Sequence, residues 1–362
     1  MVEAKFNSWT GIPRLTGTLL LVGLASLLYL FVLAVDGTGT SEVSLSLPFI
    51  ACAIASGLVG YGTIPVLQKL KTGQFVREDG PKAHLKKAGT PTMGGVFFLP
   101  IAVVAALCWS RFDLNVCAVS IVTLAYMGIG LLDDWQVLRL KSNKGISPRM
   151  KLILQIAIAV LFCLWAVTTQ PASITTIALP LGFMLPLGWL FWAIAGFAVV
   201  AESNSSNITD GVDGLAGGVS AIGFLGLAAI VAPTSPALML FCACMAGGCL
   251  GFVAHNRNPA KVFMGDTGSL AIGGAMAAVG IVSHNLWSLF IISGIFFVES
   301  LSVIAQVSYY KATKGPDGKG KRLLKMAPLH HHLELSGWTE TQIVGAFYLV
   351  EFGLVILALV LK

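Results

Sequence analysis

Charged residues are scarce in this sequence, at 11% of 362 positions, whereas soluble proteins carry about a quarter. Hydrophobic residues make up 56% of the chain, and its mean hydropathy is +0.83. A soluble domain of this length has no need of so much apolar sequence. The scarcity of charge therefore excludes a soluble protein and predicts a chain whose solvent is lipid.

Cysteine chemistry is also lacking. The seven cysteines lie within or beside apolar runs, without zinc-site spacing and without polar neighbours: Cys52, Cys108, Cys117, Cys163, Cys242, Cys244 and Cys249. We interpret them as small hydrophobic residues and predict that they form neither a metal site nor disulfides.

Long apolar runs are what the sequence has in abundance. A helix needs about 20 apolar residues to cross the hydrocarbon, and a transmembrane barrel would instead show short segments of alternating polarity. Eleven continuous runs are present, near residues 15–35, 46–69, 93–110, 116–133, 150–168, 187–202, 213–232, 236–254, 267–283, 286–310 and 339–361. They predict an all-α, polytopic integral membrane protein. The first run lacks a clean cleavage site and is expected to be retained.

Lysine and arginine are distributed unequally between the two sides of these runs. With the N-terminus placed inside, 21 of the 23 basic residues fall in inside segments, and only Arg111 and Lys362 fall outside. Basic loops stay in the cytoplasm, so the loops at 69–92, 134–151 and 311–337 are predicted to be cytoplasmic. The net charge of +6 then reflects topology together with anionic headgroups or substrates. No basic patch is interleaved with aromatic residues, which argues against nucleic acid as a partner.

Acidic residues gather on the same side, beginning with Asp133 and Asp134 in GIGLLDDWQVLRLKSNKG. Adjacent carboxylates at a membrane exit lose hydration and repel each other unless a cation is near. Two interpretations are open, a solvated helix end and a metal or phosphate site. The pair is followed by Arg139, Lys141 and Lys144, and this favours the second.

A second polar group lies in AESNSSNITDGVDGLAGG, residues 201–218. Its polar side chains recur at every third position: Asn204, Asn207, Asp210 and Asp213. Gly211 and Gly214 favour a turn that leads into a helix N-terminus, where amide N–H groups suit an anion. Carboxylates and carboxamides are the oxygen ligands that Mg²⁺ takes alongside substrate phosphates. The alternative is an ordinary turn with an N-capping aspartate.

The segment 255–274 holds three residues with two open interpretations each. Asp266 precedes a helix start and is either an N-cap or a ligand. Phe263 is either membrane packing or a flat ring on which a base stacks. Asn256 is either a turn former or an amide that reads a base.

Three consecutive histidines, His330, His331 and His332, follow a basic loop. Successive residues of a helix point about 100° apart, so three adjacent histidines cannot all bind one ion. One or two of them facing phosphates is the favoured interpretation, with the rest structural.

Two further features complete the candidates. Three lysines precede an apolar run in DGPKAHLKKAGTPTMGG: Lys82, Lys86 and Lys87. They serve either as phosphate contacts or as ordinary inside charge. Glu299 lies inside an apolar run, where an acid is costly unless paired. Its candidate partners are Ser300, Ser302, Gln306 and a basic group of the site.

Together these residues are the inventory for a metal-dependent reaction on phosphates. Their motifs resemble the phospho-N-acetylmuramoyl-pentapeptide transferase family, within the polyprenyl-phosphate N-acetylhexosamine-1-phosphate transferase superfamily. The resemblance begins near residue 46 and rests on these motifs: GTPTMGG (89–95), LLDD (131–134), NKG (143–145), NxxNxTDGxDGLA (204–216), NxxPAKVFMGDTGSLA (256–271), FFVESLSVIAQV (296–307) and APLHHHLE (327–334). The first and last favour this family over relatives that use UDP-N-acetylglucosamine, which are the enzymatic alternative.

The resemblance implies a bundle of ten to eleven transmembrane helices with cytoplasmic catalytic loops. Residues 1–45 would be an N-terminal extension with an extra helix, and 46–362 the transferase domain. The implied reaction moves phospho-MurNAc-pentapeptide from UDP-MurNAc-pentapeptide to undecaprenyl phosphate, giving lipid I and UMP for peptidoglycan synthesis, with Mg²⁺ as cofactor. The implied location is the lipid bilayer of the bacterial inner (plasma) membrane, with the site on the cytoplasmic face. Whether the protein forms a homodimer stays open.

Roles carry over by motif. The implied catalytic residues are Asp133, Asp134, Asp266, His330 and His331, with Asp266 as the Mg²⁺ ligand and the Asp133–Asp134 pair as further candidate ligands. The implied substrate-binding residues are Lys82, Lys141, Lys144, Asn204, Asn207, Asp210, Gly211, Asp213, Asn256, Phe263 and Gln306. Among them, Gly211 and Asn256 would lie near the uridine, and Phe263 would stack on uracil. The histidines would lie near the diphosphate or sugar.

The chain departs from the family at Val137, where a lysine is usual, and Arg139 or Lys141 would take over that phosphate contact. Two mechanisms are open: direct attack by undecaprenyl phosphate, and an aspartyl-phosphate intermediate. A transporter is the non-enzymatic alternative. It would place ionisable residues near the bilayer midplane, whereas apart from Glu299 and Glu351 they cluster at one face.

Overall fold

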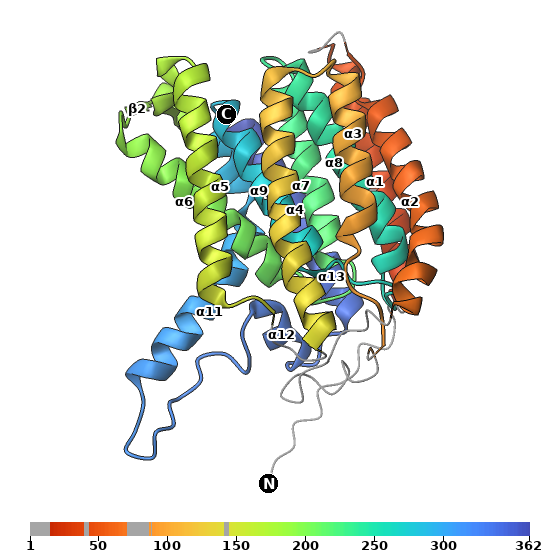
Figure 1. Ribbon diagram of the computed structural model, residues 1–362, viewed down its shortest axis with the longest axis vertical. Coiled ribbons are helices and arrows are strands. Elements are labelled where there is room, and N and C mark those ends of the chain that lie inside the picture. Colours follow the sequence, from red (N-terminus) through yellow and green to blue (C-terminus); the bar gives the residue numbers. More distant parts are fainter. Residues whose placement is uncertain (1–14, 40–42, 71–86, 88, 141–144) are drawn as a thin grey trace.

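A computed structural model describes residues 15–39, 43–70, 87, 89–140 and 145–362. Within these residues the chain is almost entirely helical, and most of the helices run side by side in one bundle (Figure 1). Their bounds are α1 Gly17–Gly37, α2 Ser46–Lys69, α3 Gly95–Trp109, α4 Leu114–Leu140, α5 Pro148–Thr169, α6 Leu190–Thr209, α7 Leu215–Val231, α8 Pro236–Asn256, α9 Gly265–Val282, α10 Leu286–Ile292, α11 Gly294–Ala312, α12 Leu329–Glu334 and α13 Glu340–Val360.

The predicted apolar runs and the helices coincide. Each of the eleven runs falls on one helix or, near 286–310, on the pair α10 and α11. Seven helices are long and apolar enough to cross a membrane, and the bent pair brings the number to eight. The helices α3 and α7 are apolar but shorter. The multi-pass membrane architecture is therefore confirmed, while the count of ten to eleven spans and the domain boundary at residue 45 stay predictions.

One span is broken. Helices α10 and α11 meet at Ser293 with a bend of 67°. Because of this bend, α11 departs from the bundle toward its lower end (Figure 1). The Ser300 Oγ–H donates to Ser205 Oγ at 2.9 Å and ties the start of α11 to α6.

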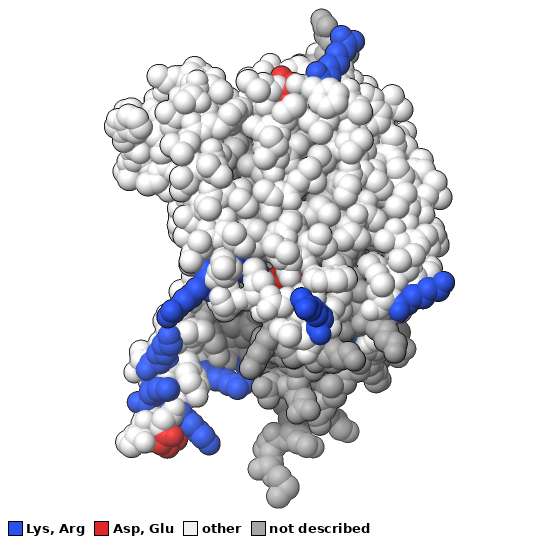
Figure 2. Space-filling model, in the orientation of Figure 1, with Lys and Arg blue, Asp and Glu red and all other residues white. Residues whose placement is uncertain are grey.

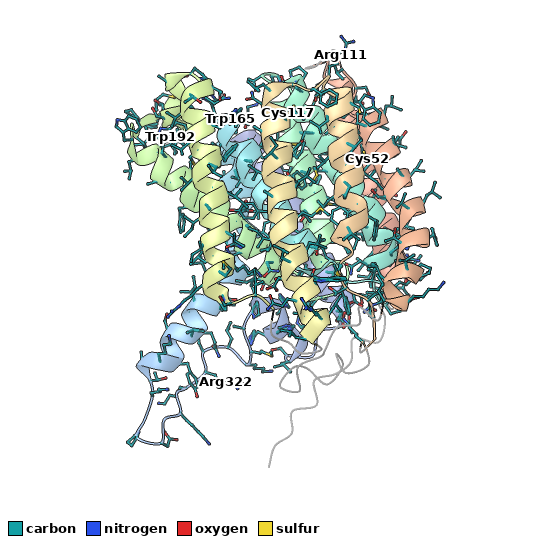
Figure 3. All side chains as sticks on the ribbon, viewed as in Figure 1. Cys52, Arg111, Cys117, Trp165, Trp192 and Arg322 are labelled. Carbon is teal, nitrogen blue, oxygen red and sulfur yellow. The ribbon has the colours of Figure 1, made fainter. Side chains whose placement is uncertain are left out.

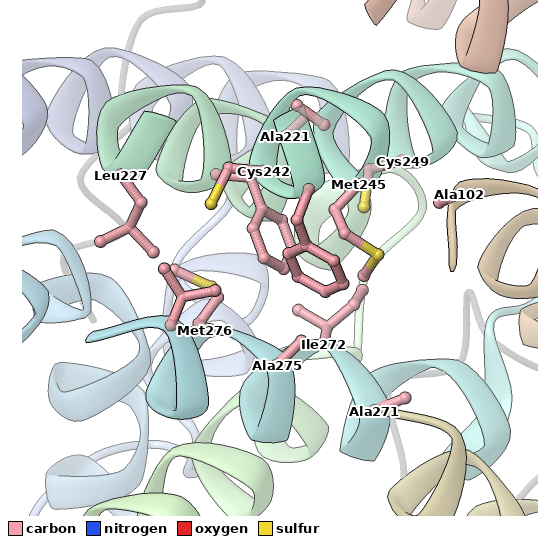
Figure 4. Packing of buried hydrophobic residues seen from close by; sticks show 14 of the residues in the cluster. Ala102, Ala221, Leu227, Cys242, Met245, Cys249, Ala271, Ile272, Ala275 and Met276 are labelled. Carbon is pink, nitrogen blue, oxygen red and sulfur yellow. The ribbon is translucent and has the colours of Figure 1, made fainter. Parts of the chain in front are cut away.

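The centre of the bundle is formed by α7, α8 and α9, whose residues are almost all buried. Figure 4 shows side chains of α8 and α9, among them Met245, Cys249, Ile272 and Met276, packing against one another. All seven cysteines are free thiols, and five of them are buried. The prediction that they act as small hydrophobic residues is confirmed.

Charge separates the two ends of the molecule. In Figure 2 most of the visible lysines and arginines surround the lower end, below a broad band without charge. Arg111 lies at the opposite end from Arg322 (Figure 3). A two-stranded hairpin, β1 Thr176–Ala178 and β2 Met184–Pro186, lies between α5 and α6. The basic end is the predicted cytoplasmic end.

Helices α2 and α8 approach each other closely because α8 carries glycines where they meet. A Cβ at Gly251 would lie 2.7 Å from Ser56 Cβ and 2.9 Å from the backbone N of Gly57. Small residues at such spacing let backbones pack directly, which is the usual source of helix association in lipid.

We expect Gly251→Ala to destabilise the protein by ~1–3 kcal/mol, because the added methyl group overpacks this contact. The measurement is the thermal unfolding midpoint of the detergent-purified protein. The control is Gly128→Ala on α4, where a Cβ meets nothing within 4 Å. Equal midpoints for the two variants would contradict the described packing.

Candidate functional site

Four aspartates converge at the basic end of the bundle, where α4, α6 and α9 meet. We call Asp133, Asp134, Asp210 and Asp266 the acidic pocket. Helices α4 and α9 come together closely because residue 130 is glycine, and a Cβ there would overlap the backbone of Asp266 and Thr267. The predicted association of the Asp133–Asp134 pair with Asp266 is therefore present in the structure.

Asp134 caps α9 from the neighbouring helix. Its Oδ2 accepts from the backbone N–H of Thr267 at 3.0 Å and from the Thr267 hydroxyl at 2.6 Å, and its Oδ1 accepts from the backbone N–H of Asp266 at 3.3 Å. A carboxylate is favourable at a helix N-terminus because the first N–H groups have no partner within the helix. Asp134 therefore holds Asp266 in place.

Asp266 lies in the first turn of α9 and receives two donors. The Asn207 amide donates to its Oδ1 at 2.7 Å, and Lys151 Nζ donates to its Oδ2. The same Asn207 amide donates to Ser269 Oγ at 2.9 Å, which fixes its orientation. Both oxygens of Asp266 thus point into the space between α4, α5 and α6.

Asp133 faces Asp266 directly, and their carboxyl groups interact. Its Oδ1 accepts from the backbone N–H of Ile146 at 2.9 Å. The loop reaches this position because residue 145 is glycine, since a Cβ there would collide with the Asp133 carboxylate. The glycine of the NKG motif therefore lets the backbone lie close to the acidic pocket.

Asp210 completes the acidic pocket just beyond the end of α6. Burial, together with the carboxylates of Asp266, Asp134 and Asp213, raises the pKa of Asp210 to about 8. Among the described residues Lys151 is the cation bonded to this group. This raised pKa reflects the repulsion among four carboxyl groups that share one ammonium group, and a bound cation would relieve that repulsion.

The oxygen donors of the acidic pocket suit Mg²⁺. In the described part of the chain, no three His, Cys, Asp or Glu side chains form a ready-made metal cage. Mg²⁺ does not need one, because it usually takes one or two carboxylates and completes its shell with water and substrate phosphates. Asp266 and Asp133 are the pair whose oxygens face the same space.

A second charged group lies around Lys87, and we call it the Lys87 cluster. Lys87 Nζ donates to Asp213 Oδ1 at 2.8 Å and to Glu340 Oε2 at 2.7 Å. The Asn258 amide also bridges the two acids, at 3.2 and 3.1 Å. Burial alone would lower the pKa of Lys87, but the two carboxylates outweigh it and raise that pKa. Lys87 therefore remains charged.

The Lys87 cluster borders a cavity of about 330 Å³. Its lining residues come from the loop before α9, from the end of α12 and from the start of α13: Asn258, Glu334, Leu335, Trp338, Thr339, Glu340 and Thr341. Open space therefore lies beside Glu340 and Asn258, outside the acidic pocket.

Asn256 orders the loops between these groups. Its Oδ1 accepts from the backbone N–H of Gly214 at 2.8 Å, and its Nδ2 donates to the Val262 carbonyl at 2.8 Å. Asn256 is buried, and these bonds fix the turn after α6 against the segment that carries Phe263. Phe263 itself is half-buried. The turn after α6 leads into α7, as predicted.

The three histidines point to three different partners. His330 Nδ1 lies 3.0 Å from Glu299 Oε2, and His331 Nδ1 lies 2.6 Å from Glu334 Oε2. His332 Nδ1 accepts from the backbone N–H of Lys325. The prediction that they do not bind one ion together agrees with this geometry, and Glu299 is paired with a basic group of the site.

Other predicted residues lie apart from the acidic pocket. Gln306 Oε1 accepts from the backbone N–H groups of Leu323 and Leu324, so its amide holds the loop after α11. The Asn204 amide donates to Gln155 Oε1 and the Val200 carbonyl. The roles of Gln306 and Asn204 toward substrate stay predictions. Lys82, Lys141 and Lys144 lie outside the described residues.

Three residues of the site were not identified from the sequence: Lys151, Asn258 and Glu340. Lys151 had a detectable signal, because it lies in the first turn of α5, where a cation opposes the helix dipole. Asn258 and Glu340 are far from Lys87 in sequence, and only the folded structure brings them together.

Comparisons with known proteins identify the family of this chain. Glycosyl transferase family 4 matches residues 116–284, and a phospho-N-acetylmuramoyl-pentapeptide-transferase signature matches residues 87–99. The phospho-N-acetylmuramoyl-pentapeptide-transferase of Gloeothece citriformis is 68% identical over 99% of this chain and 100% of its own length. That of Rippkaea orientalis is 65% identical over 99% and 100%, and that of Microcystis aeruginosa 64% identical over 95% of each chain. The chain therefore belongs to the phospho-N-acetylmuramoyl-pentapeptide-transferase family.

Proposed function

We propose that this enzyme transfers phospho-MurNAc-pentapeptide from UDP-MurNAc-pentapeptide to undecaprenyl phosphate, releasing UMP and forming lipid I, with Mg²⁺ as cofactor. The supporting observation is the acidic pocket, where four aspartates and Lys151 gather at the basic end of a membrane-embedded bundle. A soluble nucleotide and a lipid can meet only at such a membrane surface. We assign this end to the cytoplasm, because it carries most of the lysines and arginines (Figure 2).

Asp266 and Asp133 would hold Mg²⁺ in this proposal. When bound, the ion would neutralise the donor diphosphate and the charge that develops on the leaving UMP. Asp134 keeps α9 and Asp266 in register through its bonds to Thr267. Phosphoryl transfer depends mainly on the positions of the reacting groups and on charge neutralisation. Carboxylates held in fixed positions suit both requirements.

Lys151 supplies the cation for the reacting phosphates. Its ammonium group is bonded to Asp266 and lies at the start of α5. Substrate phosphates would attract this ammonium group more strongly than the Asp266 carboxylate would once that carboxylate held a metal ion. We therefore assign to Lys151 a contact with the acceptor phosphate, which would attack the donor directly.

The nucleoside would bind toward the Lys87 cluster. Asp213 and Asn258 offer polar groups there, and the half-buried Phe263 offers a flat ring for uracil. Through its bonds to Gly214 and Val262, Asn256 holds the segment that carries this ring against the turn after α6.

The test of this function is an assay of the purified protein with UDP-MurNAc-pentapeptide and undecaprenyl phosphate, with and without Mg²⁺. UMP release that requires the lipid acceptor and Mg²⁺ is the expected result. UDP-N-acetylglucosamine serves as the competing donor. If UDP-N-acetylglucosamine were turned over faster than UDP-MurNAc-pentapeptide, the protein would be the related transferase that uses that donor.

We expect Asp266→Asn to lower kcat by at least about a hundredfold, because it removes a negative ligand that positions the charge-neutralising ion. The matched control is Asp113→Asn at the other end of the bundle, where Asp113 Oδ1 accepts from the backbone N–H groups of Asn115 and Val116. Asparagine caps helices as well as aspartate does, so this control should retain wild-type turnover. Substantial activity in Asp266→Asn would remove Asp266 from the metal site.

We expect Lys87→Met to raise the KM for the nucleotide about tenfold or more, while kcat changes less. The substitution removes the ion pair that holds Asp213, and we assign Asp213 to nucleotide binding rather than to the chemical step. Lys69→Met, which alters an exposed lysine at the end of α2, is the control. Initial rates over a range of donor concentrations measure both constants. A fall in kcat alone would place Lys87 in the chemical step instead.

A further inference from the structure

Glu299 and His330 form a buried pair, and no role has been assigned above to Glu299. Glu299 lies on α11 shortly after the break at Ser293, and His330 opens α12. Glu299 Oε2 lies 3.0 Å from His330 Nδ1, and Glu299 Oε1 accepts from the His330 backbone N–H at 3.2 Å. Their side chains are 0% and 1% exposed. One carboxylate therefore fixes both the backbone and the ring of His330.

The pairing determines which way the imidazole faces. A carboxylate only accepts hydrogen bonds, so His330 Nδ1 must carry a proton and donate it to Glu299. The bond to Glu299 uses Nδ1 and leaves Nε2, the other ring nitrogen, for a second partner.

The other ring nitrogen has no partner. His330 Nε2 is buried, and no described residue forms a hydrogen bond with it. It lies against Gly211, where the Cβ of any other residue would collide with the His330 ring. Gly211 follows Asp210 of the acidic pocket directly. A buried ring nitrogen without a protein partner, next to the acidic pocket, is a position where a ligand atom can bind.

Neighbouring histidines do not share this arrangement. His331 is bonded to Glu334 and His332 to the Lys325 backbone. The ring of His331 contacts that of His330 edge-on, with centroids 4.2 Å apart. His331 therefore packs against His330 and limits its rotation.

We propose that Glu299 is a positioning residue that holds His330 so that its Nε2–H donates to a phosphate oxygen of the nucleotide donor, across Gly211. This inference rests on the proposed function for the identity of the donor. Charge-assisted hydrogen bonds to phosphate are among the strongest that proteins make. The missing side chain at Gly211 makes room for the His330 ring, which therefore lies directly beside the turn that carries Asp210.

The experiment is a double-mutant cycle measured first on the affinity for UDP, by calorimetry with Mg²⁺ present, and then on kcat and KM. His330→Asn retains an amide near the Nδ1 position but has nothing at Nε2, whereas His330→Gln places an amide nitrogen near Nε2. Glu299→Gln keeps the shape of the side chain and removes its charge. Glu351→Gln is the control, because Glu351 is equally buried and its oxygens have no hydrogen-bond partner among the described residues.

We expect Glu299→Gln and His330→Asn each to weaken UDP binding about ten- to a hundredfold, the range for hydrogen bonds to charged groups. The double variant should be no weaker than His330→Asn alone, because Glu299 acts through His330. His330→Gln should recover part of the loss, and Glu351→Gln should bind UDP as the wild type does.

The inference would be overturned if the double variant lost UDP affinity by the product of the two single losses. Such a result would mean that Glu299 acts independently of His330, as a purely structural residue would. Wild-type affinity in His330→Asn would overturn it as well. Binding of UDP with the expected coupling, but no transfer to undecaprenyl phosphate, would refute the proposed function and leave the positioning role intact.

Discussion

The bond between Asp134 and the N-terminus of α9 is the constraint on which the rest of the site depends. It joins two helices through one carboxylate that accepts three hydrogen bonds from residues 266 and 267. The glycine at position 130 permits this contact by letting the backbones approach. Without it, Asp266 would have no fixed direction, and the donors from Asn207 and Lys151 would have no common target.

The acidic pocket and the Lys87 cluster differ in how closely their acidic and basic groups are matched. The acidic pocket has more carboxyl groups than cations, whereas the Lys87 cluster pairs its lysine with two acids. In the proposed function, Mg²⁺ would balance the carboxyl groups of the acidic pocket. The second group is satisfied within the protein, which gives it a fixed shape before any ligand arrives.

Much of the architecture was predictable, because lipid leaves so few options for the backbone. Every apolar run became a helix, and the pairing of the Asp133–Asp134 motif with Asp266 followed from the motifs. The different duties of the two adjacent aspartates were not predictable. Neighbouring residues of a helix face different directions, so only the register of α4 against α9 decides that Asp134 caps a helix while Asp133 faces the pocket. The partners of Lys87 depend likewise on contacts across the fold.

The bend between α10 and α11 has a mechanical consequence. Beyond Ser293, α11 leaves the bundle and exposes Leu301 and Ile304 to the surroundings, yet it also carries Glu299 on its buried side. Any tilt of α11 must therefore move the hydrogen-bonded backbone and ring of His330 with it. The helix thus joins an exposed apolar surface to a buried histidine, so that the position of His330 depends on the position of that surface.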